Sequence, residues 1–198
     1  ILAERRKAAG KGKYKEPVSP DTSGLPELPA GWVWASVERV ASNVVDCPHS
    51  TPKWTDKGKL CVRTSDFEPG RLNLATARYV SDETFAFRNA RLVPQGGDVL
   101  YSREGGILGI ACEIPPGVQL CLGQRMLLIR PSEIVHTAWV MNWLNSQFIL
   151  QRVQRLTGGS ASPHLNVGDI RAFPIPLPPL AEQHQIVAEV ERRLSIVA

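Results

Sequence analysis

Three residue types capable of nucleophilic or metal chemistry lie within the segment Asp46-Cys-Pro-His49. A carboxylate, a thiol and an imidazole could activate a nucleophile or bind zinc, but such sites need further groups that converge in space. No other cysteine or histidine is close in the sequence, so we favour a loop made rigid by Pro48 and Pro52. Its other side chains suit contacts with phosphates and bases, namely His49, Ser50, Thr51, Lys53 and Trp54.

Two polar interruptions of apolar strands form a second set of candidates. Ser102-Arg-Glu-Gly-Gly follows directly on one apolar segment, and Gly123-Gln-Arg interrupts another. In a major groove Arg103 would suit guanine and Glu104 cytosine, whereas the alternative is a hairpin with a surface ion pair. Long polar side chains in a buried strand are costly unless they are hydrogen-bonded, so the Gln-Arg pair is expected at a bulge or sheet end. Functional and structural interpretations are equally favoured at both places.

Two further polar segments have simple structural alternatives. Arg63-Thr-Ser-Asp66 closes a short strand, where a capped turn explains the residues as well as a DNA contact does. The segment 157–164 combines small hydroxyl residues with His164, and a plain linker between helices is the favoured interpretation. The sequence contains neither GxGxxG nor GK[ST], so no phosphate loop for a nucleotide cofactor is predicted.

The charge of the chain is distributed unevenly. The 198 residues carry a formal net charge of +4, and the basic residues of segment 1–16 exceed its acidic residues by the same four. The rest of the chain is therefore neutral. If this body binds DNA, its basic residues must be clustered on one face.

Composition indicates a cytoplasmic protein without a membrane segment. No apolar run approaches the roughly 20 residues of a membrane span, and the charged N-terminus does not resemble a signal peptide. The four cysteines form no CxxC pair, and Cys61, Cys112 and Cys121 are expected to be reduced core residues. Because the first residue is not Met, we expect the chain to be a piece of a longer protein.

The candidate segments must be positioned by a β-rich body. Strand patterns cover 59–64, 97–102, 108–114 and 120–131, each closed by polar or Gly/Pro residues. A helix is predicted over 136–156, because Val140, Leu144 and Phe148 recur at a spacing of four. The expected class is α+β, with a twisted, mainly antiparallel sheet and packed helices.

The C-terminal part predicts a stiff joint followed by an amphipathic helix. Four prolines between 174 and 179 exclude a helix there. From residue 180 the apolar spacing of seven, three, four and three resembles a coiled-coil seam, with polar Gln183 and His184 at the first middle position. The residues expected at this helix interface are Leu180, Val187, Val190, Leu194 and Val197.

The order of these segments resembles the specificity subunit of type I restriction-modification systems. The likeness extends from Leu28 to the end of the chain, and the segment 165–187 is its most specific part. The motifs that carry it are Leu28-Pro-x-Gly-Trp-x-Trp, Asp46-Cys-Pro-His-Ser-Thr-Pro, Val62-Arg-Thr-Ser-Asp, Gly97-Asp-Val-Leu-Tyr-Ser-Arg-Glu-Gly, Leu122-Gly-Gln-Arg-Met and Pro176-Leu-Pro-Pro-Leu-Ala-Glu-Gln.

The resemblance implies a non-catalytic target recognition domain that reads half of a split site in double-stranded DNA. Helices that pair with a second recognition domain, or with a second copy, would set the spacing. This chain would bind no cofactor. Partner modification subunits would use S-adenosylmethionine to methylate adenine, and a restriction subunit would use ATP and magnesium.

The residues expected to contact DNA lie in five loops. Arg103 and Arg125 are the best candidates for base edges, and Lys53 for a phosphate. The full set is His49, Thr51, Lys53, Trp54, Arg63, Ser65, Ser102, Arg103, Glu104, Gln124, Arg125, Ser160 and His164.

We expect the chain to be divided into 1–9 (the end of a conserved helix), 10–27 (a linker), 28–173 (the recognition domain), 174–179 (the proline joint) and 180–198 (the start of a coiled-coil helix). Three alternatives remain. One is the recognition region of a fused methyltransferase, for which this chain lacks an Asn/Asp-Pro-Pro-Tyr motif. The second is a small metallohydrolase that uses Asp46, Cys47, His49 and His164. The third is a scaffold module that acts only through its helices.

Overall fold

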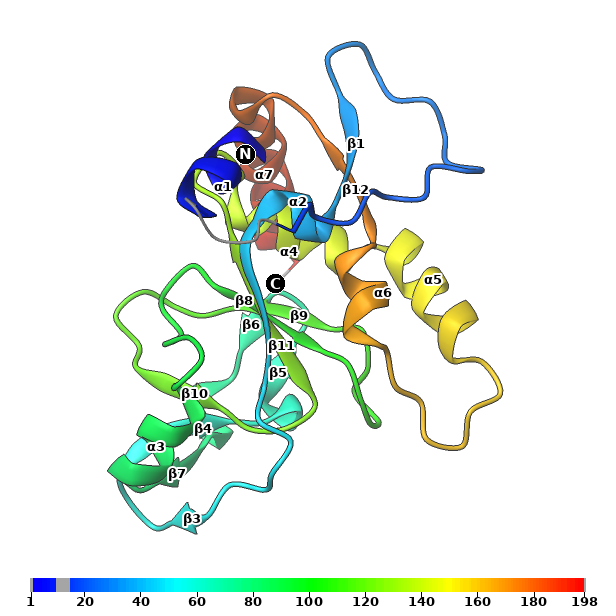
Figure 1. Cartoon of the computed structure of the whole chain (residues 1–198). Coiled ribbons are helices and arrows are strands. Elements are labelled where there is room, and N and C mark those ends of the chain that lie inside the picture. Colours follow the sequence, from blue (N-terminus) through cyan, green and yellow to red (C-terminus); the bar gives the residue numbers. More distant parts are fainter. Residues whose placement is uncertain (1, 10–14, 198) are drawn as a thin grey trace.

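A four-stranded antiparallel sheet with both faces buried forms the centre of the fold (Figure 1). The structure is a computed structural model and describes residues 2–9 and 15–197. The strand order is β2 (Ala41–Asp46), β11 (Met126–Pro131), β8 (Val99–Ser102) and β9 (Ala111–Glu113). Leu127 and Ile129 belong to one core, while Met126 and Leu128 belong to the other. Burial on both faces explains why this strand reads as a continuous apolar run rather than an alternating one.

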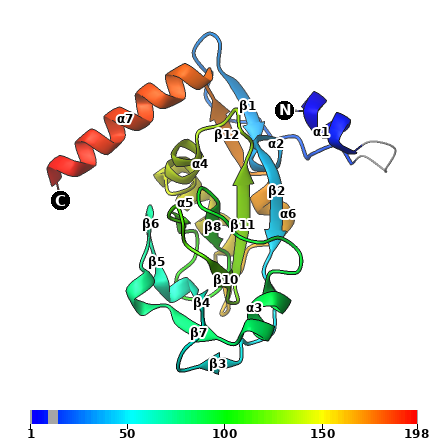
Figure 2. The ribbon, with the colours of Figure 1, turned by 90° about the vertical axis from the view of Figure 1, so that its left-hand side faces the viewer.

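A second sheet shares one of the two cores with the central sheet and forms the lower part of the molecule in Figures 1 and 2. Its order is β10 (Leu120–Leu122), β4 (Lys59–Val62), β7 (Arg78–Val80) and β3 (Trp54–Thr55). The β10–β4 pair is parallel and the other pairs are antiparallel, so the mainly antiparallel α+β class is confirmed. Cys61 and Cys121 are opposite each other in the parallel pair, buried and free. Helix α3 (Asp82–Arg88) packs against this sheet.

Short elements connect β4 to β7 within the second sheet and contact β9 of the central sheet. A two-stranded hairpin joins β5 (Phe67–Glu68) to β6 (Arg71–Leu72). Single 3-10 turns precede and follow it, η1 (Thr64–Asp66) and η2 (Leu74–Thr76).

Helices cover the other face of the central sheet. They are α2 (Val37–Val40), α4 (Thr137–Leu144), α5 (Gln147–Thr157) and α6 (Val167–Arg171). Tyr101 of β8 meets Phe173, which follows α6, edge to face at 6.4 Å between ring centroids. None of the helices in the described ranges is long and apolar enough to cross a membrane.

The single helix expected over 136–156 is wrong, because two helices occupy this segment. Asn145 ends α4, and its side chain bonds to both the N–H and the carbonyl of Ala111 at 2.9 Å each. Ser146 then caps α5 by accepting from Ile149 N at 3.4 Å. The apolar period continues across the break, so the pattern alone did not reveal it.

The first four residues of the proline joint form a strand. β12 (Pro174–Leu177) pairs antiparallel with β1 (Val33–Ser36). The proline carbonyls are also used, since Trp143 Nε1 donates to Pro174 O at 2.7 Å and Trp139 Nε1 to Pro176 O at 3.0 Å. Prolines fit this position because a two-stranded ribbon leaves the N–H positions of one edge unpaired.

Helix α7 (Leu180–Val197) projects from the body, and the short helix α1 (Leu2–Ala9) lies at the other end of the chain (Figure 2). Val187 is buried in the core shared with α4, Val190 is half-buried, and Leu180 and Leu194 are exposed. The side chain of Val197 lies outside the described residues, as do residues 10–14 of the expected linker. A coiled-coil partner for this helix therefore remains a prediction.

Buried Gln183 explains why the first heptad of α7 is imperfect. Its Oε1 accepts from His136 N at 2.9 Å, and its Nε2 donates to Pro178 O at 2.9 Å. The amide thus fastens α7 to the start of α4 and to the end of the proline segment. An apolar residue at this position would leave both backbone groups without their partner.

We therefore expect Gln183→Ala to lower the free energy of unfolding by about 1–3 kcal/mol, because two buried backbone groups lose their hydrogen bonds. Urea unfolding followed by circular dichroism would measure it. Gln185→Ala is the matched control, since Gln185 is exposed on the same helix. Equal effects of the two substitutions would contradict this role.

Candidate nucleic-acid interface

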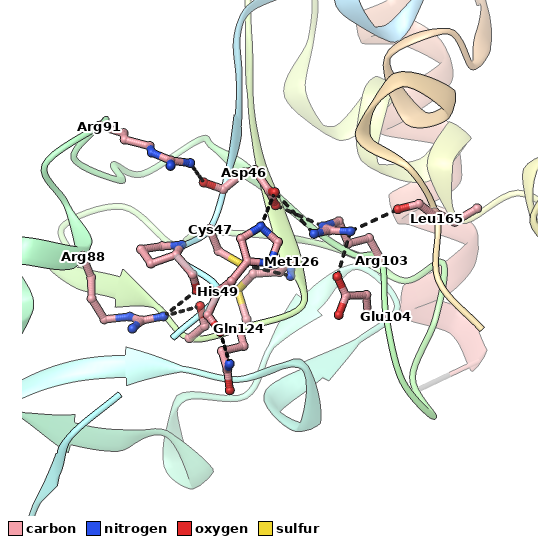
Figure 3. A network of polar contacts seen from close by, with 12 residues as sticks. Asp46, Cys47, His49, Arg88, Arg91, Arg103, Glu104, Gln124, Met126 and Leu165 are labelled. Atoms are coloured by element: carbon pink, nitrogen blue, oxygen red, sulfur yellow. Dashed lines mark hydrogen bonds and ion pairs between the residues drawn. The ribbon is translucent and has the colours of Figure 1, made fainter. Parts of the chain in front are cut away.

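The polar loops singled out from the sequence come together at one end of the central sheet (Figure 3). Glu104 and His164 form an isolated antiparallel β-bridge, and Gly105 N donates to Pro163 O at 3.4 Å. Thr51 Oγ1 donates to Gln124 Oε1 at 3.3 Å, and Gln124 Nε2 donates to the carbonyl of His49. The loop at 104–105 is therefore bonded to the segment 163–164, and the loop at 49–51 is bonded to Gln124.

An ion pair between Arg103 and Asp46 lies at the centre of this end. Arg103 Nε and Nη2 donate to the two carboxylate oxygens of Asp46 at 3.0 and 3.3 Å. Its Nη1 lies 2.8 Å from Glu104 Oε1 and donates to Leu165 O at 3.2 Å. The side chains of Arg103 and Asp46 are only 7% and 19% exposed. The pair therefore ties the end of β2 to the end of β8 and to the segment before α6.

Main-chain bonds strengthen the same junction. Arg103 N donates to Arg125 O at 2.9 Å, and Leu165 N donates to Arg103 O at 2.8 Å. The position of Arg125 is consequently fixed by Arg103.

The base-edge contact expected for Arg103 is not compatible with this geometry. Its donors are already used by Asp46, Glu104 and Leu165, and the side chain is buried. Ser102 is also fully buried, and its Oγ accepts from Ile110 N at 2.9 Å. Both residues hold the loops in place and are not available to a ligand in this conformation.

The cluster at Asp46, Cys47 and His49 does not form a nucleophilic site. His49 Nε2 lies 2.9 Å from Asp46 Oδ2, but the Cys47 thiol is buried. Burial raises the pKa of Cys47, which opposes the effect of the bond that Met126 N donates to Cys47 Sγ at 3.5 Å. The thiol is therefore kept protonated. In the part of the chain that the structure describes, no three His, Cys, Asp or Glu residues converge as a metal site, so the geometry does not favour the metallohydrolase.

Arg63 belongs to the capped turn that was its structural alternative. Its guanidinium donates to Asp66 Oδ1 at 2.8 Å and to Thr76 O at 2.7 Å, and Asp66 is buried. The side chain of Arg63 is nevertheless 34% exposed at the edge of the loops.

Arg88 holds the candidate loops in place, and the sequence patterns did not predict this role. Although it lies on a surface helix, it is only 4% exposed. Its guanidinium donates to Pro48 O at 3.1 Å, Ser50 O at 3.0 Å and Gly123 O at 2.7 Å, and also to Leu122 O. One side chain thus holds two of the loops together. Ser81, followed by the acidic residues of a first turn, was the available signal for its helix.

Arg125 is an exposed donor at this junction. It is exposed, and within the described chain its side chain has no hydrogen-bond or ion-pair partner. Its φ is +69°, which is rare for a residue with a side chain and marks a position held by its surroundings. Gly105 faces it, where a β-carbon would lie 3.3 Å from Arg125 Nη1. The guanidinium thus lies close to the backbone of Gly105 and is still exposed.

A hollow of about 330 Å³ lies beside Arg125, and it is lined among others by Trp54, Arg63, Ser65 and Gln124. Arg78 stacks over the Trp54 ring with 4.4 Å to the centroid. Arg63 and Arg125 therefore line this hollow and Arg78 lies against its Trp54, while the charge of Arg63 is paired with Asp66.

The remaining candidates are accessible from solvent to different degrees. His49, Thr51, Lys53, Ser65, Ser160 and His164 are exposed, while Trp54, Glu104 and Gln124 are half-buried.

These features define a class of protein: an α+β domain with polar loops at one end of a buried sheet and a projecting helix. The family model described as "Type I restriction modification DNA specificity domain" matches residues 54–192. The chain belongs to this family. A search of curated proteins gives no significant match.

Solved structures share the fold. A structure from work on complex assembly and conformational transition of the type I R-M system has a TM-score of 0.67 at 22% identity over 88% of this chain and 41% of that chain. The HsdS subunit from Thermoanaerobacter tengcongensis has a TM-score of 0.63 at 22% identity over 88% and 40%. The S subunit from M. genitalium has a TM-score of 0.52 at 9% identity over 84% and 42%. The chain thus spans about two fifths of the length of these relatives.

Arg103→Met is expected to lower the free energy of unfolding by about 3 kcal/mol or more, because it leaves the Asp46 carboxylate largely buried without its cation. Urea unfolding would measure this. Combined with Asp46→Asn, the loss should be smaller than the sum of the two single losses.

The control for this prediction is Arg71→Met, which breaks the exposed pair between Arg71 and Glu68 and should change stability little. If Arg103→Met were no more harmful than Arg71→Met, the buried pair would not organise these loops.

Proposed function

We propose that this chain is the part of a specificity subunit that reads one half of a split site in double-stranded DNA. The family match and the gathering of polar loops at one end support this role. The longer protein would act in the cytoplasm without catalysing a reaction itself.

In this proposal the chemistry belongs to partner subunits. A methyltransferase subunit with S-adenosylmethionine would modify adenine, and a restriction subunit would use ATP and magnesium. The projecting helix α7 would pair with a second recognition domain or a second copy, which fixes the distance between the half-sites. The exposure of Leu194, at 63%, agrees with a partner on that helix.

The observation that carries the reading role is the state of Arg125. Its side chain is exposed and has no partner among the described residues, and its backbone has a φ of +69°. A planar fork of donors matches the O6 and N7 acceptors of guanine in the major groove. The buried Arg103 pair supplies the rigidity that such a contact needs.

We expect Arg125→Ala to weaken binding to the cognate duplex by about 1–3 kcal/mol and to relax the sequence preference at one base pair. Selection from a random duplex pool, with the full-length subunit and its methyltransferase partner, would show the preference directly. The wild-type complex should enrich one split motif.

Arg125→Gly separates the effect of losing the side chain from the effect of straining the backbone in this experiment. Glycine adopts a φ of +69° freely, so the variant should be at least as stable as Arg125→Ala and still lose the preference. Retention of the full motif by both variants would remove Arg125 from the interface.

A further inference from the structure

A second hollow lies on the other side of the loop that carries Lys53. Its volume is about 490 Å³, and it is enclosed between residues 50–55 and helix α3. None of the α3 residues that line it was a candidate from the sequence. The loop therefore has two sides, one toward Arg125 and one toward α3.

The walls of this α3 groove offer donors suited to an anion. Within the described chain Lys53 is exposed and makes no ion pair or hydrogen bond. Ser50 contributes a hydroxyl without a hydrogen-bond partner in the same part of the structure. Thr84 Oγ1 accepts from Ser81 Oγ at 3.1 Å, which leaves its own hydrogen free to donate.

The floor of the groove carries a buried positive charge. Arg88 lines it and bonds to backbone carbonyls, and no described carboxylate forms an ion pair with it. The carbonyl dipoles stabilise the guanidinium charge, but no anion neutralises it. The charge therefore contributes a positive electrostatic potential to the groove, where the dielectric constant is low. Glu83, on the rim, is the one acidic side chain of the lining and opposes this potential.

The outer edge of the groove is apolar. The ring of Phe87 is 64% exposed although the residue is large and hydrophobic. The hydroxyls and the cation on one side of the groove suit a phosphate, and the exposed ring on the other side suits the deoxyribose linked to it. Base edges would instead require acceptors and donors in a fixed plane.

We propose that the α3 groove binds the sugar–phosphate backbone of the DNA next to the bases read at Arg125. Lys53, Ser50 and Thr84 donate to a phosphate, and Phe87 packs against the adjoining sugar. This inference rests on the proposed function. Arg88 joins the groove to the loop that contains Gly123. A contact between the groove and the DNA backbone therefore fixes the distance between Arg125 and the base pairs.

The test is the salt dependence of DNA binding by the full-length subunit with its methyltransferase partner, on the selected duplex and on a scrambled one. Lys53→Ala should weaken binding to both duplexes by the same factor and reduce the slope of log K against log salt by about 1. Thr84→Val should weaken both equally with a smaller change in slope. Glu83→Gln should strengthen both, because it removes a like charge from the rim.

Lys15→Ala is the matched control, since Lys15 is exposed on the N-terminal segment outside the groove. It should leave affinity and slope unchanged. A change of sequence preference in Lys53→Ala would mean that the groove reads bases, and would overturn the proposal. If Lys53→Ala lost binding to the methyltransferase partner but kept its affinity for DNA, the proposal would also be overturned. The groove would then be a surface that docks a protein.

Failure of this inference is distinguishable from failure of the proposed function. If the wild-type complex prefers its motif while Lys53→Ala retains full affinity and slope, only the groove assignment fails. If the wild-type complex does not distinguish the two duplexes, the reading role itself fails.

Discussion

The ion pair between Arg103 and Asp46 is the constraint on which the arrangement of the polar loops at the end of the central sheet depends. Two charges taken out of water are tolerated only when their remaining donors and acceptors are satisfied, and here Glu104 and the Leu165 carbonyl complete the set. Satisfying this one arginine requires the ends of β2 and β8 and the segment before α6 to meet at one point. The hydrogen bond from Arg103 N to Arg125 O then fixes the backbone of exposed Arg125 relative to this point.

The sheet behind this junction explains why the loops can be polar and still be fixed. Because both of its faces are buried, its strands are anchored by two cores. Loops at the end of such a sheet can present donors without adding to the core themselves. Arg88 supplies a second fastening from the outside by binding carbonyls of two loops. Buried Arg88 and Arg103 thus hold the backbone of these loops, and exposed Arg125 is the residue that we propose to contact DNA.

Much of the fold could be predicted from the sequence, but much of the site could not. The strands around residues 59–131 and the projecting helix follow from apolar periodicity and from the proline and glycine residues between them. The break at Asn145 is invisible to that periodicity, because a side chain that bonds to a strand edge depends on tertiary contact. The same limit applies to Arg103 and Arg125. Both interrupt apolar segments, and only three-dimensional placement shows that one is buried and the other exposed.

The most direct test of the central claim is the adenine methylome of the source cell with the gene intact and with it deleted. If the chain directs methylation, deletion should abolish modification at one split motif and leave other methylated motifs untouched. Restoring the gene with the Arg125→Ala substitution should then return methylation with a relaxed requirement in one half-site. An active methyltransferase partner whose methylation pattern is identical with and without the gene would contradict the account.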